Sequence, residues 1–228
     1  MKRILFIIAS IALFAACNGT HDETIETYAD GTPKLVYTLK GKDNIKIAEK
    51  RYYSNQQLHS DIHFKGADEL IDGTAKYYYP EGQLFAEADF TDGKSTGVKL
   101  YHSKGDAFHN GKSDSTTLIL SDLNLPAVVR YHIADSVKEY RFYEDCKLQA
   151  VGQYYQLMQT GKWQFFYPNG NIQLEALYIE DKENGVYCSY RENGVPYFRG
   201  FYINGQRAGI WEFYDALGNL SGRKDFDK

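Results

Sequence analysis

The amino-acid sequence predicts an all-β protein, built as a repeat array of antiparallel β-hairpins. The 228-residue chain is rich in aromatic residues and glycine, with 20 Tyr, 13 Phe, 2 Trp and 20 Gly, and these residue types favour strands and turns. Aromatic residues and glycines also recur with a constant step along the chain. Within each step, apolar residues alternate on either side of a glycine-containing turn, as they do in hairpins.

Residues 1–16 have the pattern of a secretory signal peptide. A basic start, Met1-Lys2-Arg3, precedes an apolar run over residues 4–14. This run is shorter than the roughly 20 apolar residues that a membrane-spanning helix needs. We therefore expect the segment to direct export rather than to stay in the membrane.

The sequence Ala15-Ala16-Cys17 resembles a bacterial lipobox, in which Cys17 is the acylated first residue of the mature chain. The residue after the cysteine is Asn18 and not aspartate, so the resemblance implies the outer membrane. Several acyl chains would hold the protein there. Residues 17–27 are expected to form a polar tether.

A period of 24 residues organises the C-terminal part of the chain. The columns that keep this step are Gly161, Gly185 and Gly209; Gly170, Gly194 and Gly218; Trp163, Tyr187 and Trp211; Phe166, Tyr190 and Tyr214; and Tyr178, Tyr202 and Phe226. The same offsets recur less regularly in residues 28–105, which we expect to be degenerate hairpin repeats. We assign residues 137–228 to the 24-residue repeats.

Each period has the pattern of one hairpin. Trp163, Phe165 and Tyr167 occupy alternate positions and share one face of a strand, because strand side chains alternate with period two. Residues 167–170, Tyr-Pro-Asn-Gly, predict a turn, since proline presets φ and glycine accepts the left-handed conformation. A second strand is expected over residues 172–178.

A small residue stands fifteen positions after the opening position of four periods. The members of this column are Ala88, Gly152, Ala176 and Gly200. A small residue leaves space for a neighbouring ring to lie across the sheet. Lys224 breaks the column in the final repeat, as expected of a terminal repeat that faces water.

Residues 106–136 do not follow the period. Segments 116–120 and 128–133 still have the composition of strands. This region is either an eroded hairpin or an insertion that divides the array, and we favour the eroded hairpin.

The repeats resemble the variant MORN repeats (membrane occupation and recognition nexus) of bacterial YwqK-like antitoxin proteins. The matching pattern is G-x-W/Y-x-x-Y/F, a turn that ends in glycine, and a second strand that ends in Tyr or Phe, as in residues 161–178, 185–202 and 209–226. It covers residues 161–228 well and 73–105 moderately. The resemblance implies an elongated single-sheet meander and a role in binding rather than catalysis, and it implies no particular partner.

Several kinds of chemistry are not expected. The formal net charge of -4, from 26 Lys+Arg and 30 Asp+Glu, argues against nucleic acid as a partner, because its binding needs clustered cations. No catalytic motif or cofactor motif is present, so we expect no enzyme and no cofactor. His59 and His63 would lie about 13 Å apart on one strand face, too far to share a metal. We expect them to be solvated and expect no metal site.

Cys146 and Cys188 lie two repeats apart. Each hairpin advances the sheet by about 10 Å, so the two residues should be roughly 20 Å apart. A disulfide requires Cα atoms within about 7 Å. Buried thiols are therefore expected, without a disulfide.

The aromatic columns have two possible roles. Trp163, Tyr187, Trp211, Tyr178 and Tyr202 are the candidate binding face, which would present flat rings to a protein partner or a glycan chain. The same rings could instead form the packing ladder between hairpins. The expected function is a cell-envelope lipoprotein that binds a protein partner; glycan or peptidoglycan binding and neutralisation of a toxin are the alternatives.

Overall fold

The computed structural model describes residues 19–108 and 113–228. The expected signal peptide and Cys17 lie outside these residues. The chain divides into two compact units, unit 1 ending at Asp106 and unit 2 beginning at Ala107. Antiparallel strands build both units, which confirms the all-β hairpin array. Over the described ranges, no helix is long and apolar enough to cross a membrane.

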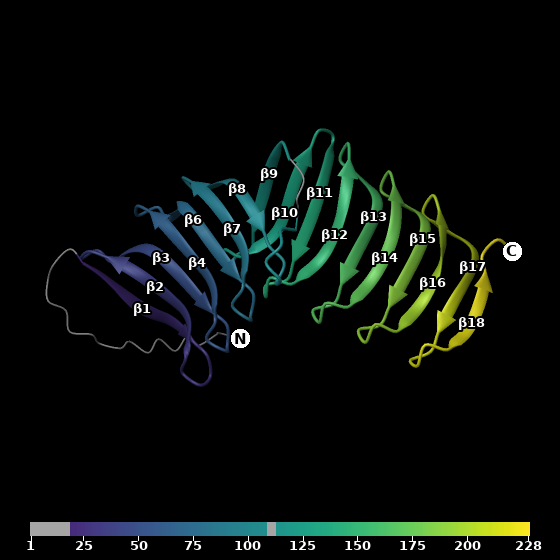
Figure 1. Ribbon diagram of the computed structural model, residues 1–228, viewed down its shortest axis with the longest axis horizontal. Helices are drawn as coiled ribbons and strands as arrows, with labels where there is room; N and C mark the ends of the chain where they lie inside the picture. The colour runs from purple at the N-terminus through teal and green to yellow at the C-terminus, as the bar shows by residue number, and fades with distance from the viewer. Residues whose placement is uncertain (1–18, 109–112) are drawn as a thin grey trace, which may run out of the picture. The chain divides into compact units, whose positions relative to one another are not determined.

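Unit 1 is a meander of antiparallel strands in which neighbours in the sheet are neighbours in sequence, apart from the short β5 (Figure 1). Its strands are β1 (Thr20–Thr27), β2 (Pro33–Lys40), β3 (Ile45–Tyr52), β4 (Leu58–Lys65), β5 (Leu70–Ile71), β6 (Gly73–Tyr78), β7 (Leu84–Thr91) and β8 (Lys94–Leu100). The two-residue β5 pairs with β4 alone.

Unit 2 is a second meander, drawn from teal to yellow in Figure 1, with the sheet order β9 to β18. Its strands are β9 (Ser115–Leu120), β10 (Pro126–Ile133), β11 (Ser136–Phe142), β12 (Leu148–Tyr155), β13 (Met158–Phe166), β14 (Ile172–Ile179), β15 (Lys182–Tyr190), β16 (Pro196–Ile203), β17 (Gln206–Tyr214) and β18 (Leu220–Asp225).

Three features differ from or refine the expected organisation. The expected polar tether is wrong for residues 20–27, which form β1 and pair with β2 along its length, because Thr and Ile suit an extended edge strand. The expected single sheet is two sheets, since no ladder joins β8 to β9. Within the irregular segment 106–136, β9 and β10 pair with each other as an antiparallel hairpin.

The glycine columns of the 24-residue period correspond to two kinds of backbone irregularity. Gly161, Gly185 and Gly209 have φ values of 64, 120 and 62°, and each stands where the register between adjacent strands shifts, as in a β-bulge. The turn glycines Gly170, Gly194 and Gly218 have φ values of 87, 82 and 88°. Both columns therefore need a left-handed conformation that glycine adopts without steric cost.

Cys146 occupies the turn position that glycine holds in the three repeats that follow it. Its φ is 65°, so it adopts the glycine-like conformation although it has a side chain. That side chain is 1% exposed. Burial of the thiol offsets part of the conformational cost of this backbone geometry.

Tyrosine hydroxyls connect successive hairpins at the turns. Each donates a hydrogen bond to a carbonyl oxygen at the end of the corresponding strand in the next hairpin: Tyr53 to Tyr78, Tyr79 to Tyr101, Tyr143 to Phe166 and Tyr167 to Tyr190, at 2.7 to 2.9 Å. The contact spans 22 to 25 residues. Successive hairpins are therefore joined by tyrosine hydrogen bonds as well as by side-chain packing.

Replacing Tyr167 by phenylalanine should destabilise unit 2 by about 1 kcal/mol, because the part-buried carbonyl of Tyr190 loses its donor. The measurement is the urea midpoint followed by tryptophan fluorescence, since both tryptophans lie in unit 2. Tyr155→Phe, at an exposed position, is the matched control. Equal midpoints for the two variants would contradict a stabilising role for this hydrogen bond.

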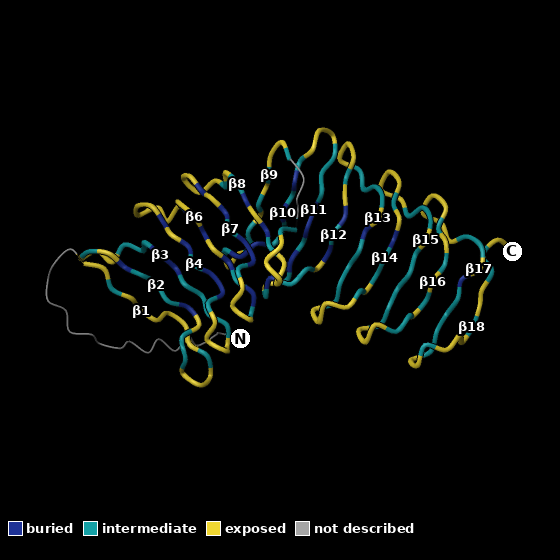
Figure 2. Tube along the Cα trace, in the orientation of Figure 1, coloured by how far each residue is buried: buried dark blue, intermediate teal, exposed yellow. Residues whose placement is uncertain are grey.

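The two units bury their strands to different extents. In Figure 2 the dark blue stretches concentrate on β4, β6 and β7, whereas β13 to β18 are mostly teal and yellow. Strand β7 is buried at four of its eight positions, and β16 alternates between half-buried and exposed positions along its whole length. Unit 2 therefore has a sheet face that is open to solvent.

Candidate functional site

The sheet of unit 2 has two faces with different chemistry. Trp163, Ala176 and Tyr187 are paired on consecutive strands and share one face, which we call the tryptophan face. Residues next to them in sequence, such as Leu177 and Val186, point to the opposite face, because strand side chains alternate. The candidate binding face expected from sequence is the tryptophan face.

Trp163 is fully buried although it lies on a single-layer sheet. Its ring lies over Gly152, where an added Cβ would stand 2.0 Å from the indole Cδ2. The indole Nε1 donates to the carbonyl oxygen of Gln153 at 3.2 Å. Arg141 covers the ring with its guanidinium carbon 5.4 Å from the ring centroid. The ring is therefore enclosed from both sides.

Trp211 repeats this arrangement 48 residues later. It is fully buried, lies over Gly200 with 2.3 Å between an added Cβ and the indole Cδ2, and donates from Nε1 to the carbonyl oxygen of Phe201 at 3.2 Å. Arg207 covers it at 4.4 Å. The expected space for a ring above the small-residue column is confirmed at Gly152 and Gly200.

The tyrosines of the candidate binding face are half-buried. Tyr187 contacts Tyr202 and Trp211, with ring centroids 5.0 and 6.0 Å apart, and Tyr202 meets Trp211 edge-on at 5.2 Å. Burial, together with the nearby charge of Glu183, raises the pKa of Tyr178 to about 12. The Tyr178 hydroxyl therefore stays protonated at neutral pH, and the three tyrosine rings belong to the packed layer.

The structure thus gives Trp163 and Trp211 the packing role, the second of the two roles considered for them. A fully buried indole has no free ring face to offer to a sugar or a peptide. Tyr187, Tyr178 and Tyr202 retain part of their surface. The more exposed apolar side chains of these strands lie on the opposite face of the sheet.

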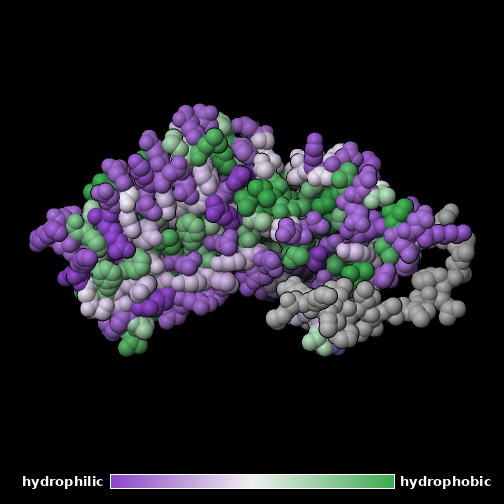
Figure 3. Space-filling model, turned by 180° about the vertical axis from the view of Figure 1, so that it is seen from behind, coloured by the Kyte–Doolittle hydropathy of each residue, from purple (hydrophilic) through white to green (hydrophobic). Residues whose placement is uncertain are grey.

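An apolar strip lies on the face opposite the tryptophan face. It consists of one exposed side chain on each of β14, β15, β16 and β17, with a second row towards the hairpin tips: Leu177, Val186, Phe201 and Ile210, then Tyr155, Ile179 and Ile203. Their exposed fractions run from 38% to 61%. Figure 3, viewed from behind, shows how hydrophilic most of the molecular surface is, with hydrophobic residues in separate groups.

The strip is a product of the repeat. Leu177 and Phe201 are 24 residues apart, as are Val186 and Ile210 and also Ile179 and Ile203. Val186 and Phe201 face each other across β15 and β16. Contiguous exposed apolar surface on a soluble domain marks an interaction site more often than scattered single residues do.

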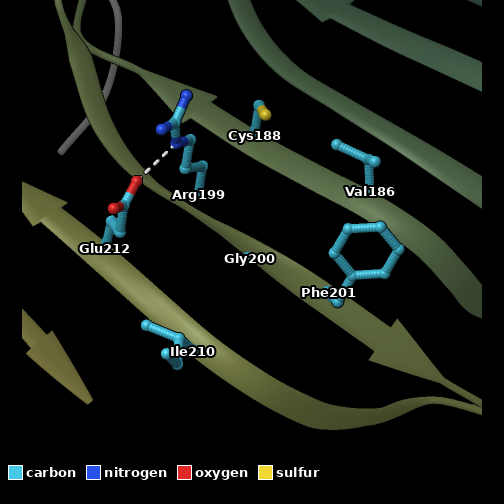
Figure 4. A pocket seen from close by; sticks show the side chains of 7 residues that line it. All are labelled: Val186, Cys188, Arg199, Gly200, Phe201, Ile210 and Glu212. Atoms are coloured by element: carbon cyan, nitrogen blue, oxygen red, sulfur yellow. Dashed lines mark hydrogen bonds and ion pairs between the residues drawn. The ribbon is translucent and has the colours of Figure 1, made fainter. Parts of the chain in front are cut away.

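A pocket of about 300 Å³ lies over β15, β16 and β17, beside the strip residues Val186, Phe201 and Ile210 (Figure 4). It is lined by Val186, Cys188, Arg199, Gly200, Phe201, Ile210 and Glu212. Val186 and Phe201 lie side by side at one end, and the Arg199–Glu212 ion pair lies at the other. The pocket offers an apolar floor with one polar wall.

A polar row runs beside the strip on the same face. Its members are paired strand by strand: Gln164, Glu175, Cys188, Arg199, Glu212 and Arg223. Lys162 forms an ion pair with Glu175. The charges of this row are largely compensated within the row.

Glu212 is the centre of that row. It accepts hydrogen bonds from the Tyr214 hydroxyl at 2.8 Å, from Arg199 Nε at 2.6 Å and from Arg223 Nη2 at 2.8 Å. These bonds, that of Tyr214 first, lower the pKa of the Glu212 carboxyl to about 2. The carboxylate is therefore ionised throughout the physiological range.

A carboxyl group with a lowered pKa in the folded state stabilises the fold above its ordinary pKa of 4.5. We expect this contribution to be complete above about pH 5 and to disappear between pH 4.5 and 2. Carboxyl NMR titration should place Glu212 near the lower value. Comparing Glu212→Gln with wild type, the stability difference should shrink over the same range; a constant difference would contradict the assignment.

The two histidines considered as metal ligands, His59 and His63, do not form a site. His59 is 8% exposed and stacks on Tyr53 at 4.2 Å, so the expectation that it is solvated is wrong, because the ring packs against the turn tyrosine. His63 is exposed next to Asp61. The described ranges contain no group of His, Cys, Asp and Glu residues suited to a metal.

Cys146 and Cys188 form no disulfide. Cys146 is buried as expected, whereas Cys188 is half-buried and lines the pocket. Burial is the larger cause and the charge of Glu175 the next, and both raise the pKa of the Cys188 thiol. The thiol is therefore a weakly polar part of the pocket wall rather than a nucleophile.

Sequence reasoning did not identify the apolar strip, although a signal was present. Leu177 and Phe201 keep the 24-residue step over two repeats, as do Val186 and Ile210, whereas the aromatic columns keep it over three. Because both faces of these strands carry apolar residues, alternation could not tell which face is covered.

Comparison with known families supports the hairpin repeats. The model of the MORN repeat variant matches residues 71–92 and 159–180, which contain β6 with β7 and β13 with β14. The fold and the family match define the class of the protein as a β-hairpin repeat module. No curated protein matches the chain.

Proposed function

We propose that the protein is a cell-envelope lipoprotein that binds a protein partner through the apolar strip of unit 2 and carries out no chemistry of its own. The observation that carries the proposal is the strip itself. Seven apolar side chains, 38% to 61% exposed, occupy one face of an ordered sheet. Their exposure costs stability that a partner would recover by covering them.

The anatomy of the strip fits a protein interface. The pocket between Val186, Phe201 and Ile210 can take an anchoring side chain, and such pockets are where binding energy concentrates. The polar row with Arg199 and Glu212 supplies a charged rim beside the apolar centre. This combination supports a protein partner.

The test is a photo-crosslinking amino acid placed at Val186 in cells that make the full chain. We expect one discrete covalent adduct, whose protein component mass spectrometry identifies. Phe201→Glu should abolish the adduct, because it places a charge in the centre of the strip. The same crosslinker at Asn193, on an exposed turn, is the control. An absent adduct, or one that Phe201→Glu leaves unchanged, contradicts binding through the strip.

The lipoprotein part of the proposal is supported by the sequence around Cys17. Radiolabelled palmitate should enter the wild type and not Cys17→Ala. Equal labelling of both proteins would exclude acylation at this residue. Fractionation of the same cells should then place the wild type, and not the variant, with the outer membrane.

A further inference from the structure

The apolar strip runs across the strands rather than along one of them. Leu177, Val186, Phe201 and Ile210 come from four consecutive strands. Neighbouring strands are about 4.8 Å apart. Measured perpendicular to the strands, the four side chains therefore lie at about 0, 4.8, 9.6 and 14.4 Å. Any partner that covers all four must present apolar groups at this spacing along a line perpendicular to the strands.

An α-helix has this spacing. With a rise of about 1.5 Å per residue, positions i, i+3, i+7 and i+10 of one helix face lie at about 0, 4.5, 10.5 and 15 Å along the axis. An extended strand does not fit as well, because its same-face side chains repeat at about 6.7 Å. A strand also binds by adding to a sheet edge, whereas the backbone groups beneath the strip already pair within the sheet.

The width of the strip also suits a helix. In the second row, Ile179 and Ile203 lie two residues further along β14 and β16 than Leu177 and Phe201 of the first row. Two residues of strand span about 6.7 Å. The two rows together therefore form a band that the apolar face of a helix, about 10 Å across with its side chains, covers from edge to edge.

The charges on the two sides of the strip are not equivalent. On one side, Arg199 and Arg223 are already paired with Glu212. On the other side, the β14–β15 tip exposes Glu180 and Asp181, with Lys182 next to them. The tip keeps an acidic excess, so a partner helix gains from basic residues on the flank that faces it.

On the basis of this geometry, and resting on the function proposed above, we infer that the partner segment bound by the strip is an amphipathic α-helix. Its apolar side chains follow the pattern i, i+3, i+7, i+10 across β14 to β17. One adjacent pair of them enters the pocket between Val186, Phe201 and Ile210. Lysine or arginine lies on the flank next to Glu180 and Asp181.

The probe is a synthetic peptide of about 18 residues, long enough to form a helix on contact. It carries leucine at i, i+3, i+7 and i+10, lysine along one flank and alanine and glutamine elsewhere. An isomer with the same composition, ordered so that apolar and polar residues alternate, favours a strand instead. Binding to the full mature chain is followed by fluorescence anisotropy, and peptide helicity by circular dichroism.

We expect the helical peptide to bind with a Kd on the order of 10 to 100 μM and to gain helicity, and the isomer to bind at least about tenfold more weakly. Phe201→Glu and Ile210→Glu should each weaken binding at least about tenfold, while Asn193→Glu should not. Unchanged tryptophan-fluorescence midpoints show that the variants fold. Replacing the lysines of the peptide by glutamate should weaken binding most at low salt.

Equal binding of the two isomers, or no binding of the helical peptide, overturns the helical partner. These results leave the proposed function standing if the adduct at Val186 forms and is lost in Phe201→Glu. If that adduct is also absent, both the partner and the proposed function are wrong. The two experiments therefore separate the nature of the partner from the use of the surface.

Discussion

Replacing Gly200 by alanine is expected to destabilise unit 2 by about 3 kcal/mol, because the new methyl group would overlap the indole of Trp211. The ring cannot move away easily, because its Nε1 donates a hydrogen bond to the Phe201 carbonyl oxygen and Arg207 lies over its other face. Gly152→Ala should have a similar effect through Trp163, where the overlap is closer still. The measurement is the urea midpoint followed by tryptophan fluorescence.

The chain itself offers a matched rescue. The repeat between these two has Ala176 in place of the glycine and Tyr187 in place of the tryptophan, so a methyl group is compatible with the smaller ring. Gly200→Ala combined with Trp211→Tyr should therefore recover more than half of the loss, with Trp163 as the remaining reporter. Additive losses in the double variant would contradict steric overlap as the cause.

The control for these variants is Gly222→Ala in β18. An added Cβ at this position meets no atom within 4 Å, and its φ is outside the left-handed range. We expect its urea midpoint to stay within experimental error of the wild type. A loss comparable with that of Gly200→Ala would show that alanine in a strand of this sheet is itself unfavourable.

Replacing Glu139 by alanine is the second substitution with a large expected effect, about 3 kcal/mol of lost stability. The Glu139 side chain is 1% exposed and accepts hydrogen bonds from Arg130 Nε at 2.6 Å and Arg141 Nε at 2.7 Å. Without the carboxylate, two guanidinium groups remain close together with no counter-charge. Both are partly exposed, which keeps the loss below that of a fully buried pair.

The loss should also reach the neighbouring tryptophan. Glu139 pairs across the strands with Gly152, and Arg141 covers Trp163. We therefore expect Glu139→Ala to shift the emission of Trp163, measured in a Trp211→Tyr background. Glu139→Gln, which keeps the shape, should lie between alanine and wild type, and Glu192→Ala, at an exposed turn, should have no effect. A free energy of unfolding within about 1 kcal/mol of wild type for Glu139→Ala would contradict this role of the carboxylate.

A similar carboxylate arrangement occurs in unit 1. Glu49 in unit 1 is 2% exposed and binds Arg51 Nε at 2.9 Å, and the segment Glu-x-Arg is 90 residues before Glu139 and Arg141. Sequence reasoning did not single out either pair, because a scattered glutamate in a strand looks solvated. Only the neighbouring strands show that both are enclosed.

The sequence was sufficient for the local architecture. Alternation and turn chemistry predicted the strands around Tyr167, and the glycine columns predicted where the chain needs left-handed backbone, as the φ values of Gly161 and Gly170 confirm. The small-residue column predicted that a ring lies across Gly152. These features depend on residues close in sequence or at a fixed step, and such relations can be read from one chain.

The tertiary structure decided which surface is available. Trp163 and Leu177 lie on opposite faces of the same sheet, and both are apolar, so the pattern alone does not say which is covered. The indole is covered by the backbone of Gly152, the Arg141 guanidinium and the carbonyl oxygen of Gln153, which the pairing of the strands brings next to it.

The aromatic columns and the 24-residue period were thus determined by the sequence, as were the hairpins that carry them. The division into two sheets, the enclosure of the tryptophans and the exposure of Val186, Phe201 and Ile210 were decided only in the folded chain. The physical reason is that burial depends on all neighbours of a side chain in space. A strand pattern specifies only the face on which that side chain lies.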